Sequence, residues 1–297
     1  MKANYRNRVG VFCLFCLPLL AMYLIFSFTP LIQTFYYSVT DWSGYGDYNF
    51  VGFQNFQKVF KDADFWNAMF NNVKFFIVGG VIVFGLALLC AALITQSKLR
   101  ESKYYRIILY MPNILSGVVI AVLWKFIFSP NFGLLNSMLE AVGLADWCKN
   151  WLGTKETAFG AIMAVWAWSG FGYYMLLMIA AIEGVPTTYL EAAEIDGANG
   201  VQRFIHIVLP MVMNMVRTCL VFFTMNAFTG IYVLVKFMTD GGPSGKTDVI
   251  IRYIYSTAFG RSRFGLSAAQ GVVVCILVGA LIMIMLKITK PKDELEY

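Results

Sequence analysis

Charged residues are scarce in this sequence. Asp, Glu, Lys and Arg make up 13% of its 297 residues, whereas a soluble domain carries about 25%. Hydrophobic residues reach 59%, and they recur in runs of the roughly 20 residues that a helix needs to cross a bilayer. The composition therefore excludes a soluble globular protein and predicts an integral membrane protein.

Groups that do chemistry are also missing from the apolar runs. His206 is the only histidine, and no cysteine or carboxylate accompanies it at metal-ligand spacing, so we expect no metal. No Asp or Glu lies deep within a run, which leaves no buried ion relay and no base for an intramembrane enzyme. Five of the six cysteines lie inside apolar runs, where a thiol behaves as a small hydrophobe; they are Cys13, Cys16, Cys90, Cys219 and Cys275. No disulfide framework is expected.

The apolar runs predict an all-α polytopic membrane protein with six transmembrane helices. The expected spans are residues 10–38, 73–95, 106–128, 157–183, 211–236 and 266–288. The first run exceeds the h-region of a signal peptide, so it is expected to remain as a membrane helix. Between the first two spans, Phe53, Phe56 and Phe60 recur on one face, which is typical of a short helix at the membrane surface.

Basic residues near the span ends predict the orientation. Three clusters fall on one side if six helices alternate: Lys2, Arg6 and Arg8; Lys98, Arg100, Lys103 and Arg106; and Lys287, Lys290 and Lys292. That side is expected to be cytoplasmic, with both termini there and the 237–265 loop outside. The outer loop conflicts with this rule, because it also carries Lys246, Arg252, Arg261 and Arg263. The net charge of +6 indicates topology and contact with lipid headgroups, and no nucleic-acid partner.

The predicted cytoplasmic segment 188–210 reads EAAEIDGANGVQRFIHIVLP from Glu191. Thr188 and Glu191 match a capping box, so a helix from about Tyr189 is expected to stop at Gly197. Asn199-Gly200 is expected to form a turn before a second amphipathic piece. The exposed face would be small or acidic, which suits close approach by another surface. The alternative is a solvated connector in which Glu191 is only a helix cap.

This segment resembles the EAA motif of ABC-importer permeases. Glu191-Ala192-Ala193, Gly197, Ile207 and Leu209-Pro210 match its fixed positions and spacing. Further resemblance to the sugar-importer branch runs through FVGFQNFQKVFKDADFWNAMFNN, YYRIILYMPNILSGVVIAVLWKFIF and TDGGPSGKTDVIIRYIYSTAF. The resemblance implies a type I ABC-importer permease fold (MetI-like), of the maltose or glycerol-phosphate first-permease type, in a bacterial inner membrane.

The same resemblance implies partners. They are a second homologous permease, a cytosolic ATPase dimer that binds ATP and Mg, an extracytoplasmic solute-binding protein and membrane lipids; this chain itself is expected to bind no cofactor and to catalyse no reaction. The residues that would couple to the ATPase are Glu191, Ala192, Ala193, Glu194, Asp196 and Gly197. The stretch GGPSGKT at Gly241 is not a phosphate-binding loop, because Asp240 stands where the pattern needs glycine and no strand precedes it.

Two spans carry polar and aromatic residues that suit a sugar path. The candidates are Ser169, Gly170, Tyr173, Asn226, Thr229 and Gly230. Each trio shares one helical face, and maltose-type permeases are similar in placing substrate contacts on these two helices. The alternative is that small and hydroxylated residues only pack helices together. A secondary transporter acting alone is the competing function, but no intramembrane ionisable relay or pair of broken helices supports it.

Overall fold

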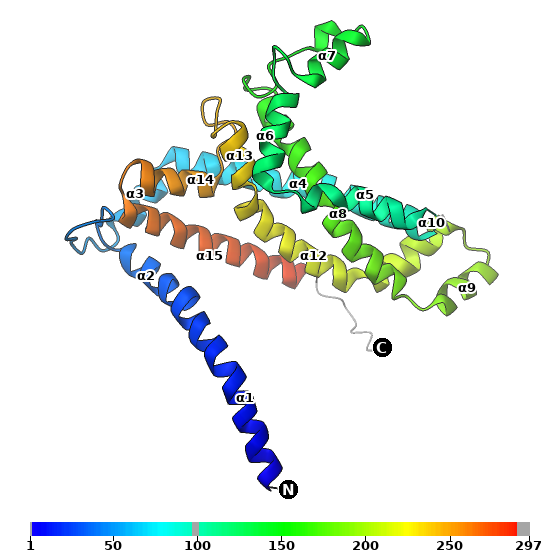
Figure 1. Cartoon of the computed structure of the whole chain (residues 1–297), viewed down its shortest axis with the longest axis horizontal. Coiled ribbons are helices and arrows are strands. Elements are labelled where there is room, and N and C mark those ends of the chain that lie inside the picture. Colours follow the sequence, from blue (N-terminus) through cyan, green and yellow to red (C-terminus); the bar gives the residue numbers. More distant parts are fainter. Residues whose placement is uncertain (1, 97–100, 290–297) are drawn as a thin grey trace. The chain divides into compact units, whose positions relative to one another are not determined.

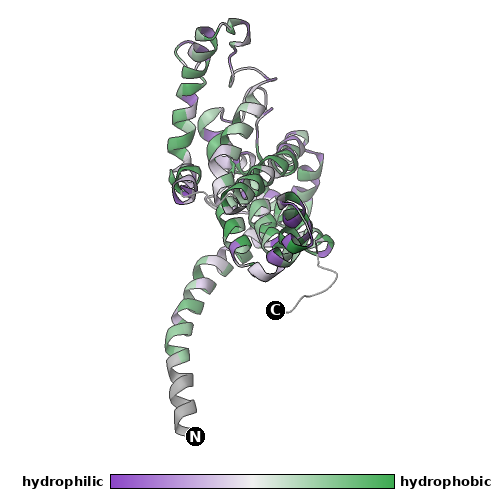
Figure 2. Cartoon of the chain, turned by 90° about the vertical axis from the view of Figure 1, so that its right-hand side faces the viewer, coloured by the Kyte–Doolittle hydropathy of each residue, from purple (hydrophilic) through white to green (hydrophobic). Residues whose placement is uncertain are grey.

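The computed structural model describes residues 2–96 and 101–289 of the chain. Long apolar helices carry most of the sequence, as Figure 2 shows by hydropathy. The helical elements in chain order are α1 (Lys2–Tyr23), η1 (Leu24–Phe28), α2 (Thr29–Tyr37), α3 (Gln54–Lys61), α4 (Ala63–Gln96), α5 (Ser102–Ile114), α6 (Gly117–Ile127), α7 (Leu134–Ala141), η2 (Ala145–Trp147), α8 (Ala158–Glu183), α9 (Thr187–Ile195), α10 (Gly200–Arg203), η3 (Phe204–Val208), α11 (Leu209–Met211), α12 (Met213–Met225), η4 (Asn226–Gly230), α13 (Tyr232–Met238), α14 (Ile250–Tyr255), η5 (Ser256–Gly260) and α15 (Phe264–Ile288).

The all-α prediction is confirmed, since over the described residues the only extended pairing is an isolated bridge between Thr40 and Phe50. Five helical stretches among these residues are long and apolar enough to cross a membrane, and a bent pair makes a sixth if it counts as one span. Lys98, Arg100, Lys290 and Lys292 lie outside the described residues.

The expected span over 106–128 is formed by a bent pair of helices. α5 and α6 meet at an angle of 94°. Pro112 lies inside α5, where it removes a backbone hydrogen bond and crowds the preceding turn. Leu115 and Ser116 are then extended, with ψ angles of 144° and 134°, before Gly117 begins α6. The sequence pattern showed an unbroken apolar run and so hid this corner.

The first of two compact units comprises residues 2–62 and 254–277. Asn55 of α3 is buried and donates from Nδ2 to the carbonyls of Ser38 and Thr40, at 3.0 Å and 2.7 Å. Gly265 lies so close to Thr40 that a Cβ there would be 2.0 Å from the Thr40 carbonyl oxygen. These contacts fix the segment after α2. Phe53 and Phe60, predicted to face a membrane surface, are 75% and 59% exposed.

The second unit comprises residues 63–253 and 278–289. In it α8 packs along α4 and α5, and α6 packs on α13 (Figure 1). Phe223 of α12 is buried at the centre, with its ring 5.2 Å from that of Trp166 and 5.3 Å from that of Phe84. Gly172 lets α5 approach α8, because a Cβ there would be 2.3 Å from the carbonyl oxygen of Leu109. Close backbone contact at a glycine is typical of membrane helix packing.

Candidate functional site

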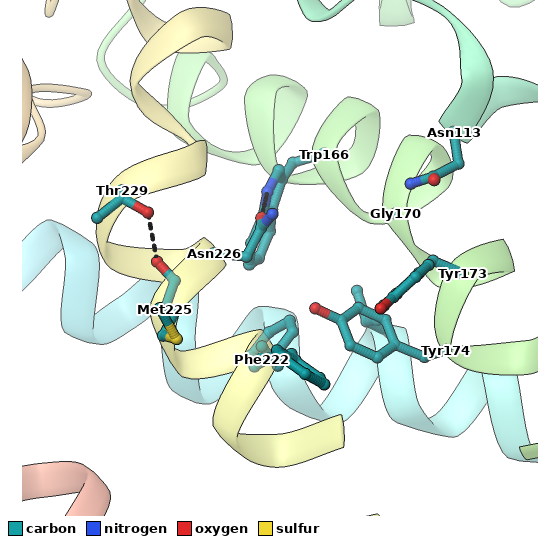
Figure 3. Close-up of a pocket in the computed structure, with 11 residues that line it drawn as sticks. Asn113, Trp166, Gly170, Tyr173, Tyr174, Phe222, Met225, Asn226 and Thr229 are labelled. Carbon is teal, nitrogen blue, oxygen red and sulfur yellow. Dashed lines mark hydrogen bonds between the residues drawn. The ribbon is translucent and has the colours of Figure 1, made fainter. Parts of the chain in front are cut away.

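A cavity of about 390 Å³ opens inside the second unit, among α4, α5, α8, α12 and η4 (Figure 3). Its lining combines aromatic rings with uncharged polar groups. The residues are Val83, Asn113, Trp166, Gly170, Tyr173, Tyr174, Phe222, Phe223, Met225, Asn226 and Thr229. None of them carries a formal charge at neutral pH. Such a lining suits a neutral solute with both hydroxyl groups and apolar faces.

The orientation of the Asn226 amide is fixed by Trp166. The indole Nε1–H of Trp166 donates to Oδ1 of Asn226 at 3.1 Å, so the amide keeps its two N–H donors for the cavity. Trp166 in turn needs Gly79 of α4, because a Cβ at position 79 would lie 2.4 Å from the indole ring. The site thus presents a donor whose direction depends on a tryptophan and a glycine behind it.

The helix carrying Asn226 is locally wound as a π-helical turn, η4. Such turns inside α-helices occur frequently at functional sites. The Thr229 hydroxyl donates to the carbonyl of Met225 at 2.7 Å, as Figure 3 shows. Its lone pairs remain free to accept from a solute. From behind, the buried Asn72 of α4 donates from Nδ2 to the carbonyl of Ala227 at 2.7 Å, which stabilises the turn.

Across the cavity, Tyr173 and Tyr174 of α8 point their hydroxyls into the same space (Figure 3). Their ring centroids are 5.3 Å apart at an interplanar angle of 82°. Asn113, close to the corner between α5 and α6, donates from Nδ2 to the carbonyl of Ser169 at 3.3 Å. The Oδ1 atom of the same Asn113 amide is a hydrogen-bond acceptor. The cavity therefore offers donors and acceptors on different walls, with ring faces between them.

The structure separates the six path candidates into two groups. Gly170, Tyr173, Asn226 and Thr229 line the cavity, whereas Ser169 and Gly230 do not. The Ser169 hydroxyl donates to the Trp166 carbonyl at 3.0 Å.

Gly230 acts from behind the cavity wall. A Cβ at this position would lie 2.8–2.9 Å from the Asn226 side chain, so glycine here leaves room for that amide.

Sequence reasoning missed several lining residues. Trp166 stands four residues before Gly170, so helical spacing from the predicted pair could have identified it. Asn113 could not be found in this way, because its position depends on the corner after Pro112. Val83, Tyr174, Phe222, Phe223 and Met225 read as ordinary apolar or aromatic residues of membrane helices.

At the other end of α8 lies the segment with the EAA residues. The helix α9 covers Thr187–Ile195 and has no buried residue. Gly197 follows at φ +81°, the left-handed conformation that glycine adopts most readily. The N–H of Gly197 donates to the Glu194 carbonyl at 3.1 Å and that of Ala198 to the Ala193 carbonyl at 2.9 Å. This pair of bonds is a Schellman motif, so Gly197 ends the helix as predicted.

The predicted capping box at Thr188 and Glu191 is wrong. Pro186 occupies the N-cap, no side chain caps the helix, and Thr188 lies inside it. The first helical residue is Thr187, so Thr188 comes too late in the chain to be the N-cap. A capping box does form one helix later, where the predicted turn stands: Gln202 N donates to Asn199 Oδ1 at 2.9 Å and Asn199 N to Gln202 Oε1 at 2.8 Å.

Two ion pairs flank the EAA segment. Arg203 pairs with Glu194, which ties α10 to α9, and Arg106 of α5 pairs with Glu183, the last residue of α8. The Glu194 side chain is 70% exposed, so its pair adds little stability in water. One pair lies on each side of the EAA segment and joins the chain there to a neighbouring helix. Both pairs can therefore help to fix the direction of α9.

The connection after α13 is held by charges and amides. Lys236 Nζ donates to Asp240 Oδ1 at 2.8 Å, and Arg252 pairs with Asp248. The hydrogen bond from Lys236, with the charge of Arg252, lowers the pKa of Asp240 below its usual 3.8. The hydrogen bond to Asp248 raises the pKa of Arg252.

Asparagines of α4 anchor the same connection. Asn67 and Asn71 donate from Nδ2 to the carbonyl of Gly245, at 2.9 Å and 3.3 Å. In GGPSGKT, therefore, the backbone around Gly245 is bound to α4. Across residues 2–96 and 101–289, no group of three or more His, Cys, Asp or Glu residues could hold a metal ion.

Relatives with curated names cover nearly the whole chain. A diacetylchitobiose uptake system permease protein, NgcF of Streptomyces coelicolor, is 35% identical over 95% of this chain and 84% of its own length. A probable starch degradation products transport system permease protein, AmyD of Thermoanaerobacterium thermosulfurigenes, is 31% identical over 98% of both chains. An sn-glycerol-3-phosphate transport system permease protein, UgpA of Agrobacterium fabrum, is 32% identical over 89% of both.

A solved structure shows the same fold. A chain of a bacterial ABC transporter involved in the import of the acidic polysaccharide alginate superimposes with a TM-score of 0.84 at 22% identity, covering 97% of both chains. The family model described as the inner membrane component of binding-protein-dependent transport systems matches residues 8–292. The chain therefore belongs to the family of inner membrane components of binding-protein-dependent transport systems.

Proposed function

We propose that this chain is one of two permease subunits of an ATP-driven importer for a neutral sugar or oligosaccharide. The observation that carries the proposal is the lining of the cavity, which joins the Asn226 amide and two tyrosine hydroxyls with aromatic rings and no charge. Sugars form hydrogen bonds through hydroxyls and stack apolar faces on rings. The names of NgcF and AmyD, which concern diacetylchitobiose and starch products, support a carbohydrate.

We further propose that α9 couples the chain to a cytosolic ATPase dimer, which carries the ATP and Mg. Support comes from α9, which has no buried residue, and from Ile195, whose 87% exposure leaves an apolar side chain uncovered at the helix end. A short rigid helix whose direction is set by Gly197 and by the Glu194–Arg203 pair can transmit a push to α8 and α12.

The first helices support a second permease as partner. No residue is buried in the most apolar part of the Phe12–Tyr37 stretch, whereas the other four long helices have 17–61% of the residues in their most apolar parts buried. Such an apolar surface is expected to be covered by lipid and by a second permease. We place both chain termini and α9 on the cytoplasmic side of a bacterial inner membrane, and the 237–265 connection outside, toward a solute-binding protein.

Gentle purification of the tagged chain from its native host tests this proposal. We expect an ATPase and a second permease to copurify, and the complex in liposomes to import oligosaccharide only with ATP inside and binding protein outside. Uptake by this chain alone, driven by an ion gradient, would falsify the proposal and favour a secondary transporter. Replacing Asn226 with Ala should lower uptake while the complex still assembles.

A further inference from the structure

A second cavity, of about 710 Å³, lies at the end of the second unit where α6 and α13 terminate (Figure 1). Its lining comes from the last turns of α6, the residues that follow them, the end of α13 and the segment just before α8. Because α9 follows the other end of α8, this α6–α13 cavity and the EAA segment lie at opposite ends of that helix. It shares no lining residue with the cavity proposed for the sugar.

Much of the wall of the α6–α13 cavity is apolar. Phe126 and Phe132 line it and are 61% and 69% exposed, and Phe237 of α13 adds a third phenyl ring. Exposed apolar surface of this kind marks a site of contact with a membrane or a partner. The volume also falls within the range of ligand pockets, about 300–1,000 Å³.

One cation belongs to the same lining. Lys125 stands in the last turn of α6 and is exposed, and none of the ion pairs found among the described residues includes it. A lysine in a membrane span is costly unless its ammonium group reaches water, a headgroup or a counter-ion.

Hydrogen-bonding groups accompany this lysine. Ser129 follows it by four residues and lines the cavity, as does Asn150. Asn150 Oδ1 accepts from the N–H of Gly153 at 3.0 Å, so its two Nδ2 donors remain for a ligand. The described residues of the lining include no carboxylate. Nothing there would pair with the amine of a zwitterionic ligand, and the site therefore favours a net negative charge.

We propose that the α6–α13 cavity binds an anionic phospholipid. The Lys125 ammonium group pairs with the headgroup phosphate, Asn150 Nδ2 donates to a phosphate oxygen, and an acyl chain lies along Phe126 and Phe132. Basic pockets between membrane helices suit such headgroups, and hydrogen bonds to a charged phosphate are stronger than those to a neutral group. The phenyl rings argue for a lipid over a soluble phosphate ester, which would leave them uncovered. This inference goes beyond the proposed function and does not depend on it.

Photocrosslinking of the intact complex in lipid nanodiscs tests the site. The nanodiscs contain phosphatidylcholine with phosphatidylglycerol as the minor lipid, and a photoreactive residue replaces Phe132. Mass spectrometry gives the ratio of the two lipid adducts, which is compared with the ratio of the two lipids in the bilayer. We expect the phosphatidylglycerol adduct to be enriched about fivefold or more over its share of the bilayer. Adducts in proportion to the bilayer composition overturn the proposal.

Two charge variants assign the enrichment to one residue. Lys125→Gln should return the adduct ratio to that of the bilayer. Lys155→Gln makes the same change in the segment before α8, at a residue that does not line the cavity, and should keep the enrichment. Equal ratios from the two variants contradict a role for Lys125. Both adducts are measured in one sample, so a lower yield of folded protein does not alter the ratio.

Two further outcomes identify a different occupant. Free glycerol phosphate in excess should leave the enrichment unchanged, and its loss would show that the cavity takes a soluble phosphate ester. A protein adduct in place of a lipid adduct at position 132 would show that another subunit covers the cavity. Either result overturns the phospholipid. The assay involves no transport, so its outcome is independent of the proposed function.

Discussion

Asn226 has its amide donor aimed into the cavity because Trp166 holds the other end of the amide. We predict that Trp166→Phe, which removes the indole N–H together with part of the ring, lowers solute affinity by about 1 kcal/mol, or about fivefold. The apparent KM for uptake measures this effect. Trp168→Phe is the matched control, because Trp168 lies on the same helix and does not line the cavity. Equal effects from both substitutions would show that ring volume matters and amide direction does not.

Gly170 has no heavy atom within 4 Å of the position that a Cβ would take, although the residue lines the cavity. A larger side chain can therefore enter the space without disturbing the fold. We predict that Gly170→Leu lowers uptake by about tenfold or more, because it occupies a solute contact within a confined site. Thermal unfolding should stay close to wild type. A normal rate of uptake would show that the solute travels elsewhere.

Asp240 makes the stability of the 237–265 connection depend on pH. Its pKa lies below the usual 3.8 in the folded chain, so its ion pair contributes stability above about pH 4 and loses it as the pH falls through the folded pKa. We predict that pepsin cleaves the 237–265 connection faster as the pH is lowered from about 4 to 2. Because the activity of pepsin itself changes over this range, the comparison is with Asp240→Asn, which should be cleaved faster than wild type at about pH 4 by a factor that shrinks toward pH 2. Identical pH profiles of cleavage for the two proteins would show that Asp240 does not stabilise this connection.

Single residues differed in how far sequence could place them. Gly170 and Tyr173 were identified because they share a helical face and because maltose-type permeases are similar in placing substrate contacts on this helix. Asn72 was not, because the sequence around Asn71 and Asn72 gives no sign of which backbone groups their side chains contact. Ser169 was grouped with the path by its hydroxyl, although that hydroxyl bonds to its own helix.

At the scale of elements, α9 depends on how it ends. Gly197 has φ +81° and open space around its Cβ position, so only the backbone restricts substitution. Asn tolerates this conformation, whereas Val strains it by about 1–3 kcal/mol. We predict that Gly197→Asn keeps most ATP-dependent uptake and that Gly197→Val loses most of it, with both chains inserted in the membrane. Similar loss from both would indicate contact with a partner at this position.

Asn72 links three elements in the second unit. Its Nδ2 donates to the Ala227 carbonyl of η4 and its Oδ1 accepts from the N–H of Ile250, both at 2.7 Å. We predict that Asn72→Leu destabilises the detergent-solubilised chain by about 2–4 kcal/mol, because two buried backbone groups lose partners. Asn67→Leu, which removes one exposed bond to Gly245, should cost far less in the same thermal unfolding assay.

Elements were predicted well where composition decides them and poorly where local geometry does. Apolar runs located α8 and α15, since length and hydropathy are sufficient for such helices. The corner between α5 and α6 escaped, because one proline in an apolar run can kink a helix or be absorbed. The start of α9 was misread for a similar reason, since Pro186 and Thr188 both provide start signals and only one is used.

At the scale of the whole molecule, two exposed apolar surfaces in different parts of the chain indicate different partners. Phe26, in the first apolar stretch, is 76% exposed, and Ile195, at the end of α9, is 87% exposed. We predict that a photoreactive residue at Phe26 crosslinks to a membrane subunit and one at Ile195 to a nucleotide-binding protein, with mass spectrometry identifying each product. Each position serves as the control for the other. Exchange of the two products would reverse the proposed assignment of the surfaces.

Asn72 also has a consequence for how delivery and release are timed. Its side-chain amide joins η4, which forms part of the cavity wall, to the start of α14 in the 237–265 connection. Were a partner to lift that connection, Asn72 Oδ1 would lose the N–H of Ile250, and the amide would be free to turn away from the Ala227 carbonyl, which allows the wide turn to rewind as ordinary α-helix. Dropping one residue from a turn rotates the rest of the helix by about 100°. Docking of a partner on the connection and the loosening of the cavity wall would then be one coupled movement.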